Sequence, residues 1–146
     1  MNQLTPEESL AVRRMARDIR VDILKMITQA QSGHTGGSLS IADLMALLFF
    51  HEMNIDPKNP RWEDRDRLVL SKGHGAPALY AALAEKGYFP KEELHHLRKI
   101  NSLLQGHPDM KHIPGVDMTT GSLGQGFSAS CGTGAGSPHG QGLHGV

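Results

Sequence analysis

The stretch "LVLSKGHGAPALYA" (residues 68–81) joins a short apolar run, a glycine-flanked histidine and a second apolar run. A continuous apolar run such as "RLVLS" (residues 67–71) is typical of a short buried strand. Gly73-His74-Gly75 then predicts a turn. Pro77 suits the first turn of a helix, which we expect to continue to Lys86. This order of strand, turn and helix predicts an α/β domain.

Two helices are expected before this strand. Thr5 and Glu8 have the spacing of a capping box, and apolar residues follow at helical intervals as far as Ala30. The segment "IADLMALLFF" (residues 41–50) is apolar on nearly every side, which predicts a buried helix. Because only one clear strand is visible, either further strands hide in the loops or the sheet lies beyond this chain.

The composition restricts the partners and the compartment. The 146 residues suffice for one domain, and 15 basic residues balance 15 acidic ones, so no basic surface indicates nucleic acid. The longest apolar run, "LMALLFF" (residues 44–50), is too short to cross a membrane, and the polar first residues do not resemble a signal peptide. A single cysteine, Cys131, indicates a reducing compartment, so we expect a cytoplasmic protein.

Three segments each place a histidine beside glycine near the expected start of a helix or end of a strand. They contain His34 in "SGHTGGSLSIADL", His74 in the stretch quoted first, and His107 in "LLQGHPDMKHIPGVDMTTGSLGQG". Glycine lets backbone approach a ligand closely, and a helix start offers free N–H groups to an anion. The pattern favours a phosphate-bearing cofactor and proton transfer. The simpler alternative is that each histidine is a cap or an ordinary hydrogen-bonded side chain.

Other kinds of site are disfavoured by spacing. "GSLGQG" (residues 121–126) lacks the glycine intervals of the dinucleotide fingerprint. His95 and His96 are adjacent, so they point to different faces of a helix and do not form a metal pair. His107 and His112 have no matching cysteine or carboxylate frame. A histidine-rich metal-binding module therefore rests on composition alone, and no metal ligand is expected.

From about Leu4 to Ser128 the chain resembles the amino-terminal part of transketolases, specifically the separate N-terminal subunit of enzymes divided over two chains. The motifs "SGHTGGSLSIADLMALLF", "DRDRLVLSKGHGAPALYAALAEKGYF" and "GHPDMKHIPGVDMTTGSLGQG" follow in family order at family spacing. The resemblance implies a thiamine diphosphate-binding fold, a parallel sheet flanked by helices, which is incomplete in this chain. It also implies transfer of a two-carbon ketol unit from a ketose phosphate to an aldose phosphate.

The resemblance assigns four cofactor-binding residues. His74 matches the histidine that bonds the diphosphate. Gly121, Ser122 and Leu123 match the segment whose backbone contacts the aminopyrimidine, with Ser122 where proline is more usual.

The resemblance also assigns two catalytic residues. His34 matches a histidine near the substrate hydroxyls that assists proton transfer, and His107 matches one beside the reacting carbonyl. Neutral imidazole can donate, accept or relay a proton near neutral pH, which suits both roles.

The chain departs from the family after "GSLGQGFSA". The later segments with the ligands for Mg²⁺ are absent, as is the half expected from a C-terminal transketolase subunit in a dimeric or heterotetrameric assembly. We therefore expect a partial domain over 1–128 and a non-homologous, disordered tail over 129–146, which a frameshift near Ala129 would explain. The alternatives are a 1-deoxyxylulose-5-phosphate synthase-like enzyme and an inactive, truncated remnant that does not bind the cofactor.

Overall fold

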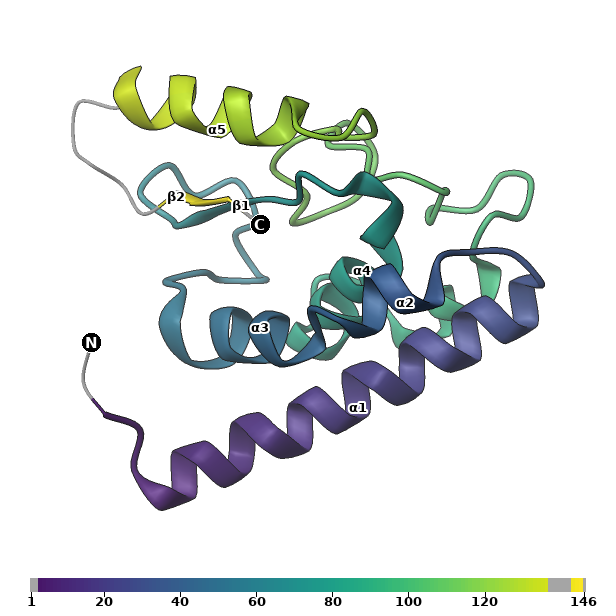
Figure 1. Cartoon of the computed structure of the whole chain (residues 1–146), viewed down its shortest axis with the longest axis horizontal. Coiled ribbons are helices and arrows are strands. Elements are labelled where there is room, and N and C mark those ends of the chain that lie inside the picture. The colour runs from purple at the N-terminus through teal and green to yellow at the C-terminus, as the bar shows by residue number, and fades with distance from the viewer. Residues whose placement is uncertain (1–2, 137–142, 146) are drawn as a thin grey trace.

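The computed structural model describes residues 3–136 and 143–145, beginning with the long helix α1 (Pro6–Ala30) (Figure 1). The predicted capping box is present: Glu8 N–H donates to Thr5 Oγ1 at 3.2 Å, and Thr5 N–H donates to Glu8 Oε2 at 2.8 Å. The helix ends before Gln31, which adopts a left-handed conformation with φ of 50°.

A short helix α2 (Thr35–Leu39), not expected from the sequence, follows His34. The predicted second helix comes next, as α3 (Ala42–Leu47) continued by a π-helical turn, η1 (Leu48–Glu52). The expected burial is confirmed, because this segment contributes core residues that include Met45.

The strand, turn and helix predicted from the opening stretch are confirmed. The strand β1 (Arg67–Val69) leads through a 3₁₀ turn, η2 (Gly73–Gly75), into α4 (Ala76–Lys86), and a second 3₁₀ segment is η3 (Lys91–His96). Gly87 ends α4 with φ of 96°, a left-handed conformation that glycine adopts readily.

A second strand, β2 (Leu143–Gly145), pairs in parallel with β1. Figure 1 shows the two strands between α5 (Gln125–Gly136) on one side and the layer of α2, α3 and α4 on the other, with α1 outside that layer. This is a partial α/β fold, as expected.

Helix α5 extends past the boundary expected from the sequence. Residues 129–136 continue the helix that begins at Gln125, so helical structure does not stop at about Ser128. Small hydroxyl residues fit this helix because Ser130 Oγ donates to Phe127 O at 2.8 Å and Thr133 Oγ1 donates to Ala129 O at 2.9 Å. Glycine weakens a helix without excluding it. The rest of the expected disordered tail lies outside the described residues, except for β2.

Candidate cofactor and catalytic site

The first two histidine segments meet directly. His34 immediately precedes α2, and its ring lies edge-on to the His74 ring, with 5.0 Å between the centroids. The approach depends on a small residue in α2, because a Cβ atom at Gly37 would lie 3.1 Å from His74 Nε2.

The third segment packs against the same turn. A Cβ atom at Gly73 would lie 2.6 Å from the carbonyl oxygen of Thr120 and 2.9 Å from the backbone nitrogen of Gly121, so only glycine permits this contact. The His107 ring also lies close to Gly121, with its Cδ2 atom 3.6 Å from the position of a Cβ there. The predicted residues His34, His74, Gly121 and His107 therefore form one chain of close neighbours.

The surface around these residues is open. His34 and His107 are exposed, and His74 is half-buried. Ser122 and Leu123 follow Gly121 directly and are exposed as well, with 72% of Leu123 accessible. The turn that carries them ends at Gly124, whose φ of 86° is favourable for glycine.

Two residues that the sequence analysis did not select also belong here. Lys72 Nζ donates to Ser40 Oγ at 2.9 Å, and Ser40 Oγ in turn donates to the carbonyl of Gly37 at 3.2 Å. Burial lowers the pKa of Lys72, and no carboxylate forms an ion pair with it within residues 3–136 and 143–145. Lys72 could have been found from the sequence because it directly precedes the Gly-His-Gly turn. Ser40 gives no such signal, because only folding brings it to the site.

The end of β1 is joined to the start of α5. Phe127 N–H donates to Ser71 Oγ at 3.1 Å, and a Cβ atom at Gly126 would lie only 2.7 Å from Ser71 Cα. Ligands of α/β proteins commonly bind where strands end and helices begin, so this junction is a favourable place for a site.

A buried ion pair holds the loop between His107 and Gly121. Asp117 accepts a hydrogen bond from Arg65 and another from Leu68 N–H, the latter at 2.8 Å. Burial raises the pKa of Asp117, although Leu68 N–H and Arg65 oppose the shift by favouring the carboxylate. The pair fastens the loop to the start of β1.

The arrangement combines two exposed imidazoles, a half-buried imidazole, an ammonium group and a glycine-lined turn. Imidazole can transfer protons near neutral pH, and an ammonium without a carboxylate partner attracts an anion. Within the described residues, no group of three or more His, Cys, Asp or Glu side chains is arranged to hold a metal ion.

Residues 11–139 match the protein family described as "Transketolase, thiamine diphosphate binding domain". The chain belongs to this family. The match passes the boundary at residue 128 that the sequence suggested, and it includes helix α5.

Relatives in the transketolase family are similar over most of this chain. The 6-deoxy-6-sulfo-D-fructose transketolase subunit of Clostridium sp. (strain MSTE9) is 56% identical over 126 residues, which are 86% of this chain and 46% of the relative. The transketolase of Mus musculus is 49% identical over 125 residues, covering 84% of this chain and 19% of the mouse protein. The chain thus spans less than half the length of either relative.

Solved transketolase structures have the same fold in this region. The enzyme from Leishmania mexicana superposes with a TM-score of 0.80 at 36% identity, covering 83% of this chain and 18% of that one. The enzyme from Campylobacter jejuni superposes with a TM-score of 0.77 at 35% identity, covering 90% of this chain and 20% of the Campylobacter chain. The family resemblance and the fold class inferred from the sequence are therefore confirmed. No helix in the part of the chain described here is long and apolar enough to cross a membrane.

Proposed function

We propose that this chain is the diphosphate-binding part of a transketolase, acting together with a C-terminal subunit. The observation that carries the proposal is the convergence of the three histidine segments, in which the His34 and His74 rings lie 5.0 Å apart and Gly73 packs on Gly121. Family membership supports it, because the matched domain is a thiamine diphosphate-binding domain.

The residues present fit the cofactor. Its diphosphate is an anion, and the site offers the imidazole of His74, the backbone of a glycine turn and the Lys72 ammonium, which has no carboxylate partner in the described part of the chain. The close packing at Gly73 leaves no room for a larger side chain, and at Gly37 a Cβ atom would press against the His74 ring. We assign the diphosphate to His74, and the aminopyrimidine to the backbone of Gly121, Ser122 and Leu123.

When bound, thiamine diphosphate supplies a carbanion that accepts and releases the two-carbon unit. The residues of this chain hold the cofactor and move protons. His34 and His107 are exposed and lie close to His74 and Gly121 respectively, where each imidazole can exchange a proton with a hydroxyl or carbonyl oxygen of a bound sugar.

The substrates, partner and setting are further parts of the proposal. We infer ketose and aldose phosphates as substrates, a dimeric or heterotetrameric assembly, and a cytoplasmic role in the pentose phosphate pathway. Structures of the Pichia stipitis transketolase with sedoheptulose-7-phosphate and fructose-6-phosphate support these substrates. We expect Mg²⁺ to accompany the diphosphate, but the described residues do not fit a metal site, so we derive no step through it.

A second candidate substrate is a sulfonated ketose. The relative from Clostridium is named for 6-deoxy-6-sulfo-D-fructose, and its 56% identity exceeds the 49% of the mouse transketolase. The transketolase relatives favour this family over a deoxyxylulose phosphate synthase. An inactive remnant remains the alternative that activity measurements must exclude.

The decisive experiment combines the full chain with a candidate C-terminal subunit, thiamine diphosphate and Mg²⁺, and measures ketol transfer from fructose-6-phosphate and from its 6-sulfo analogue. We expect His34→Ala and His107→Ala to lower kcat by about 100-fold or more, because a positioned acid or base commonly contributes that much. His96→Ala is the control, since this exposed histidine lies in η3. Unchanged kcat in both site variants would remove the proton-transfer roles.

The tail is a separate proposal. The expected boundary at residue 128 and the frameshift near Ala129 would both be tested by resequencing the gene. Codons that cannot encode the family-like segment in the neighbouring frame would contradict a frameshift.

A further inference from the structure

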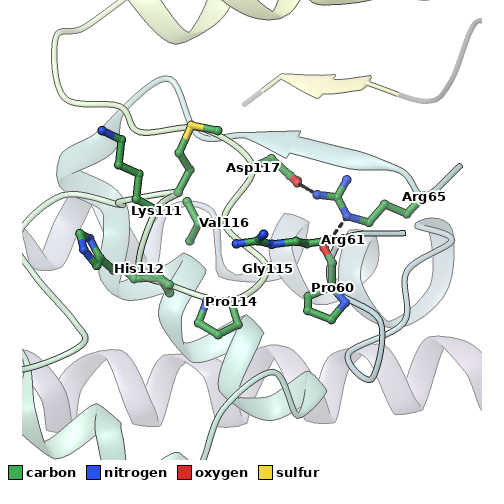
Figure 2. Close-up of a pocket in the computed structure, with 11 residues that line it drawn as sticks. Pro60, Arg61, Arg65, Lys111, His112, Pro114, Gly115, Val116 and Asp117 are labelled. Carbon is green, nitrogen blue, oxygen red and sulfur yellow. Dashed lines mark hydrogen bonds and ion pairs between the residues drawn. The ribbon is translucent and has the colours of Figure 1, made fainter. Parts of the chain in front are cut away.

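A cavity of about 470 Å³ lies beside the loop that connects His107 to Gly121. Figure 2 shows residues from two parts of the chain around it: Pro60, Arg61 and Arg65 come from the segment before β1, and Lys111, His112 and Pro114 from the later loop. None of these residues has a part in the proposed cofactor site.

The later loop is held in shape by its own hydrogen bonds. Asp109 accepts from Lys111 N–H at 2.9 Å and is bonded to His112 Nδ1 at 2.6 Å. Ile113 N–H donates to Asp109 O at 3.0 Å, and Val116 N–H donates to Ile113 O at 3.2 Å. The side chains of Ile113 and Val116 are buried, so the loop is anchored and the cavity wall is preformed.

The facing segment is also fixed. Arg65 donates to the carbonyl of Pro60 at 2.8 Å and forms its ion pair with Asp117. Asp117 is the single carboxylate among the lining residues, and both Arg65 and Leu68 N–H already bind it. The carboxylate of Asp117 is therefore already bound by two groups of the cavity wall and its surroundings.

Two positive charges remain at the cavity. Its lining holds three cations, Arg61, Arg65 and Lys111, against the one carboxylate, which leaves an excess of two. Arg61 and Lys111 form no ion pair within residues 3–136 and 143–145. Figure 2 shows Arg61 extending from Pro60 across the cavity, with Lys111 and His112 on the opposite side.

We propose that this cavity binds the phosphate monoester of a small organic molecule. A phosphate monoester carries up to two negative charges and three acceptor oxygens, which match the two unpaired cations. The planar guanidinium of Arg61 can bind two of these oxygens at once, and Lys111 supplies a point charge. The apolar walls at Pro60, Pro114 and Val116 suit the carbon part of an ester, and the cavity is large enough to hold it. A bare phosphate ion would leave the space beside these walls empty.

The test titrates the full chain with glycerol phosphate, inorganic phosphate and glycerol at constant ionic strength, and follows backbone amide chemical shifts. We expect saturable shifts at Ile113, Gly115 and Val116 with the ester, weaker binding of inorganic phosphate, and no shifts with glycerol. The double variant R61A/K111A should weaken binding of the ester by about tenfold or more, because both charge-assisted contacts are lost.

The matched control is R14A/K58A, which removes the same charges from exposed positions that do not line the cavity. Its affinity for the ester should stay within about twofold of the unmodified chain, as expected for screened surface charges. Equal weakening in both double variants would mean a general charge effect and would overturn the proposal. So would the absence of saturation, or equal affinities for the ester and inorganic phosphate.

Discussion

At Gly73 a single hydrogen atom in place of a side chain lets two turns of the site touch. A methyl group there would meet the backbone of Thr120 at 2.6 Å, and backbone moves less easily than a flexible side chain. We expect Gly73→Ala to lower the free energy of unfolding by about 1–3 kcal/mol, the usual cost of overpacking. Urea denaturation of the two proteins measures the difference.

Gly36→Ala provides the control for this substitution. Gly36 lies in α2, and a Cβ atom there would have no neighbour within 4 Å. Alanine is the better helix former, so we expect Gly36→Ala to raise the free energy of unfolding by about 0.5 kcal/mol. If both alanine variants had the same stability, close packing at Gly73 would not be the reason for its glycine.

Asp22 is an acid held where its charge is unfavourable. Burial is the main reason that its pKa rises to about 6, and the neighbouring carboxylate of Glu85 adds to the shift. Its Oδ2 atom is buried and has no hydrogen-bond partner among the residues that the structure describes, while Glu85 is bound by Lys91 at 2.5 Å. Protonation would let Asp22 donate a hydrogen bond to Glu85.

The pH dependence of stability follows from the raised pKa of Asp22. Because the pKa of Asp22 is higher in the folded state than the ordinary value of 3.8, the neutral form is favoured by folding. The stability that neutral Asp22 contributes to the folded state is complete below pH 4 and is lost as the pH rises through about 6. We therefore expect Asp22→Asn to be more stable than the unmodified chain at neutral pH, with the difference disappearing toward pH 4 in urea denaturation.

Asp56→Asn is the comparison for this pH series. Asp56 is an exposed loop residue that accepts a hydrogen bond from Lys58 N–H, and asparagine can accept the same bond. The free energy of unfolding of Asp56→Asn should differ from that of the unmodified chain by the same amount at every pH, unlike that of Asp22→Asn. A flat difference for Asp22→Asn between pH 4 and neutral pH would show that Asp22 is not forced toward its neutral form.

Among the secondary-structure elements, β1 organises the loop that follows η3, because Asp117 fastens that loop to Arg65 and to Leu68 N–H. Only 13% of the Arg65 side chain and 8% of the Asp117 side chain are accessible, so the ion pair is well protected from water. We expect Asp117→Asn to cost about 3 kcal/mol, since it leaves the Arg65 charge without its partner. Denaturation measures this cost, and amide exchange at Leu68 should accelerate.

Glu63→Gln is the matched control. Glu63 lies in the same segment before β1, is exposed, and contributes its backbone carbonyl, which accepts from Arg67 at 2.9 Å. Neutralising its side chain should change stability by less than about 0.5 kcal/mol, as is usual for surface positions. Equal effects in the two variants would contradict a special role for Asp117.

Helices and strands with local signals could be predicted from the sequence. The capping box at Thr5, the apolar run of β1 and the end of α4 at Lys86 each depend on nearby residues, and all are confirmed. The continuation of helix α5 beyond Ser128 was missed because its glycines and small hydroxyl residues have low helix propensity. The hydrogen bonds of Ser130 and Thr133 with the preceding turn become visible only in the folded chain.

For the molecule as a whole, motif spacing selected candidate site residues, but it did not indicate the contacts that support them. Motif spacing identified His34, His74 and His107, and the fold brings their segments together. Ser40 and the pair of Arg65 and Asp117 were missed because their partners are distant in sequence: Lys72 lies 32 residues from Ser40, and 52 residues separate Arg65 from Asp117. Contacts at such separations leave no periodic signal in a single sequence.

Cofactor affinity is expected to depend on the assembly. The described residues bring no metal-ligating group together, and the turn proposed to bind the cofactor is exposed at Leu123 and, just beyond it, at Phe127. We expect no measurable binding of thiamine diphosphate with Mg²⁺ to the chain alone, and saturable binding once the C-terminal subunit is added. Isothermal titration calorimetry measures both. Micromolar binding by the chain alone would contradict this expectation.

The cavity beside Arg61 has a practical consequence. The next residue, Trp62, is the one tryptophan in the chain; it is half-buried, and its backbone N–H donates to Asn59 O at 3.1 Å. Because Trp62 follows Arg61 directly in the sequence, neutralising the charge at Arg61 should change the emission of its indole. Intrinsic fluorescence can therefore report on occupancy of the cavity in the unlabelled chain, without an added dye.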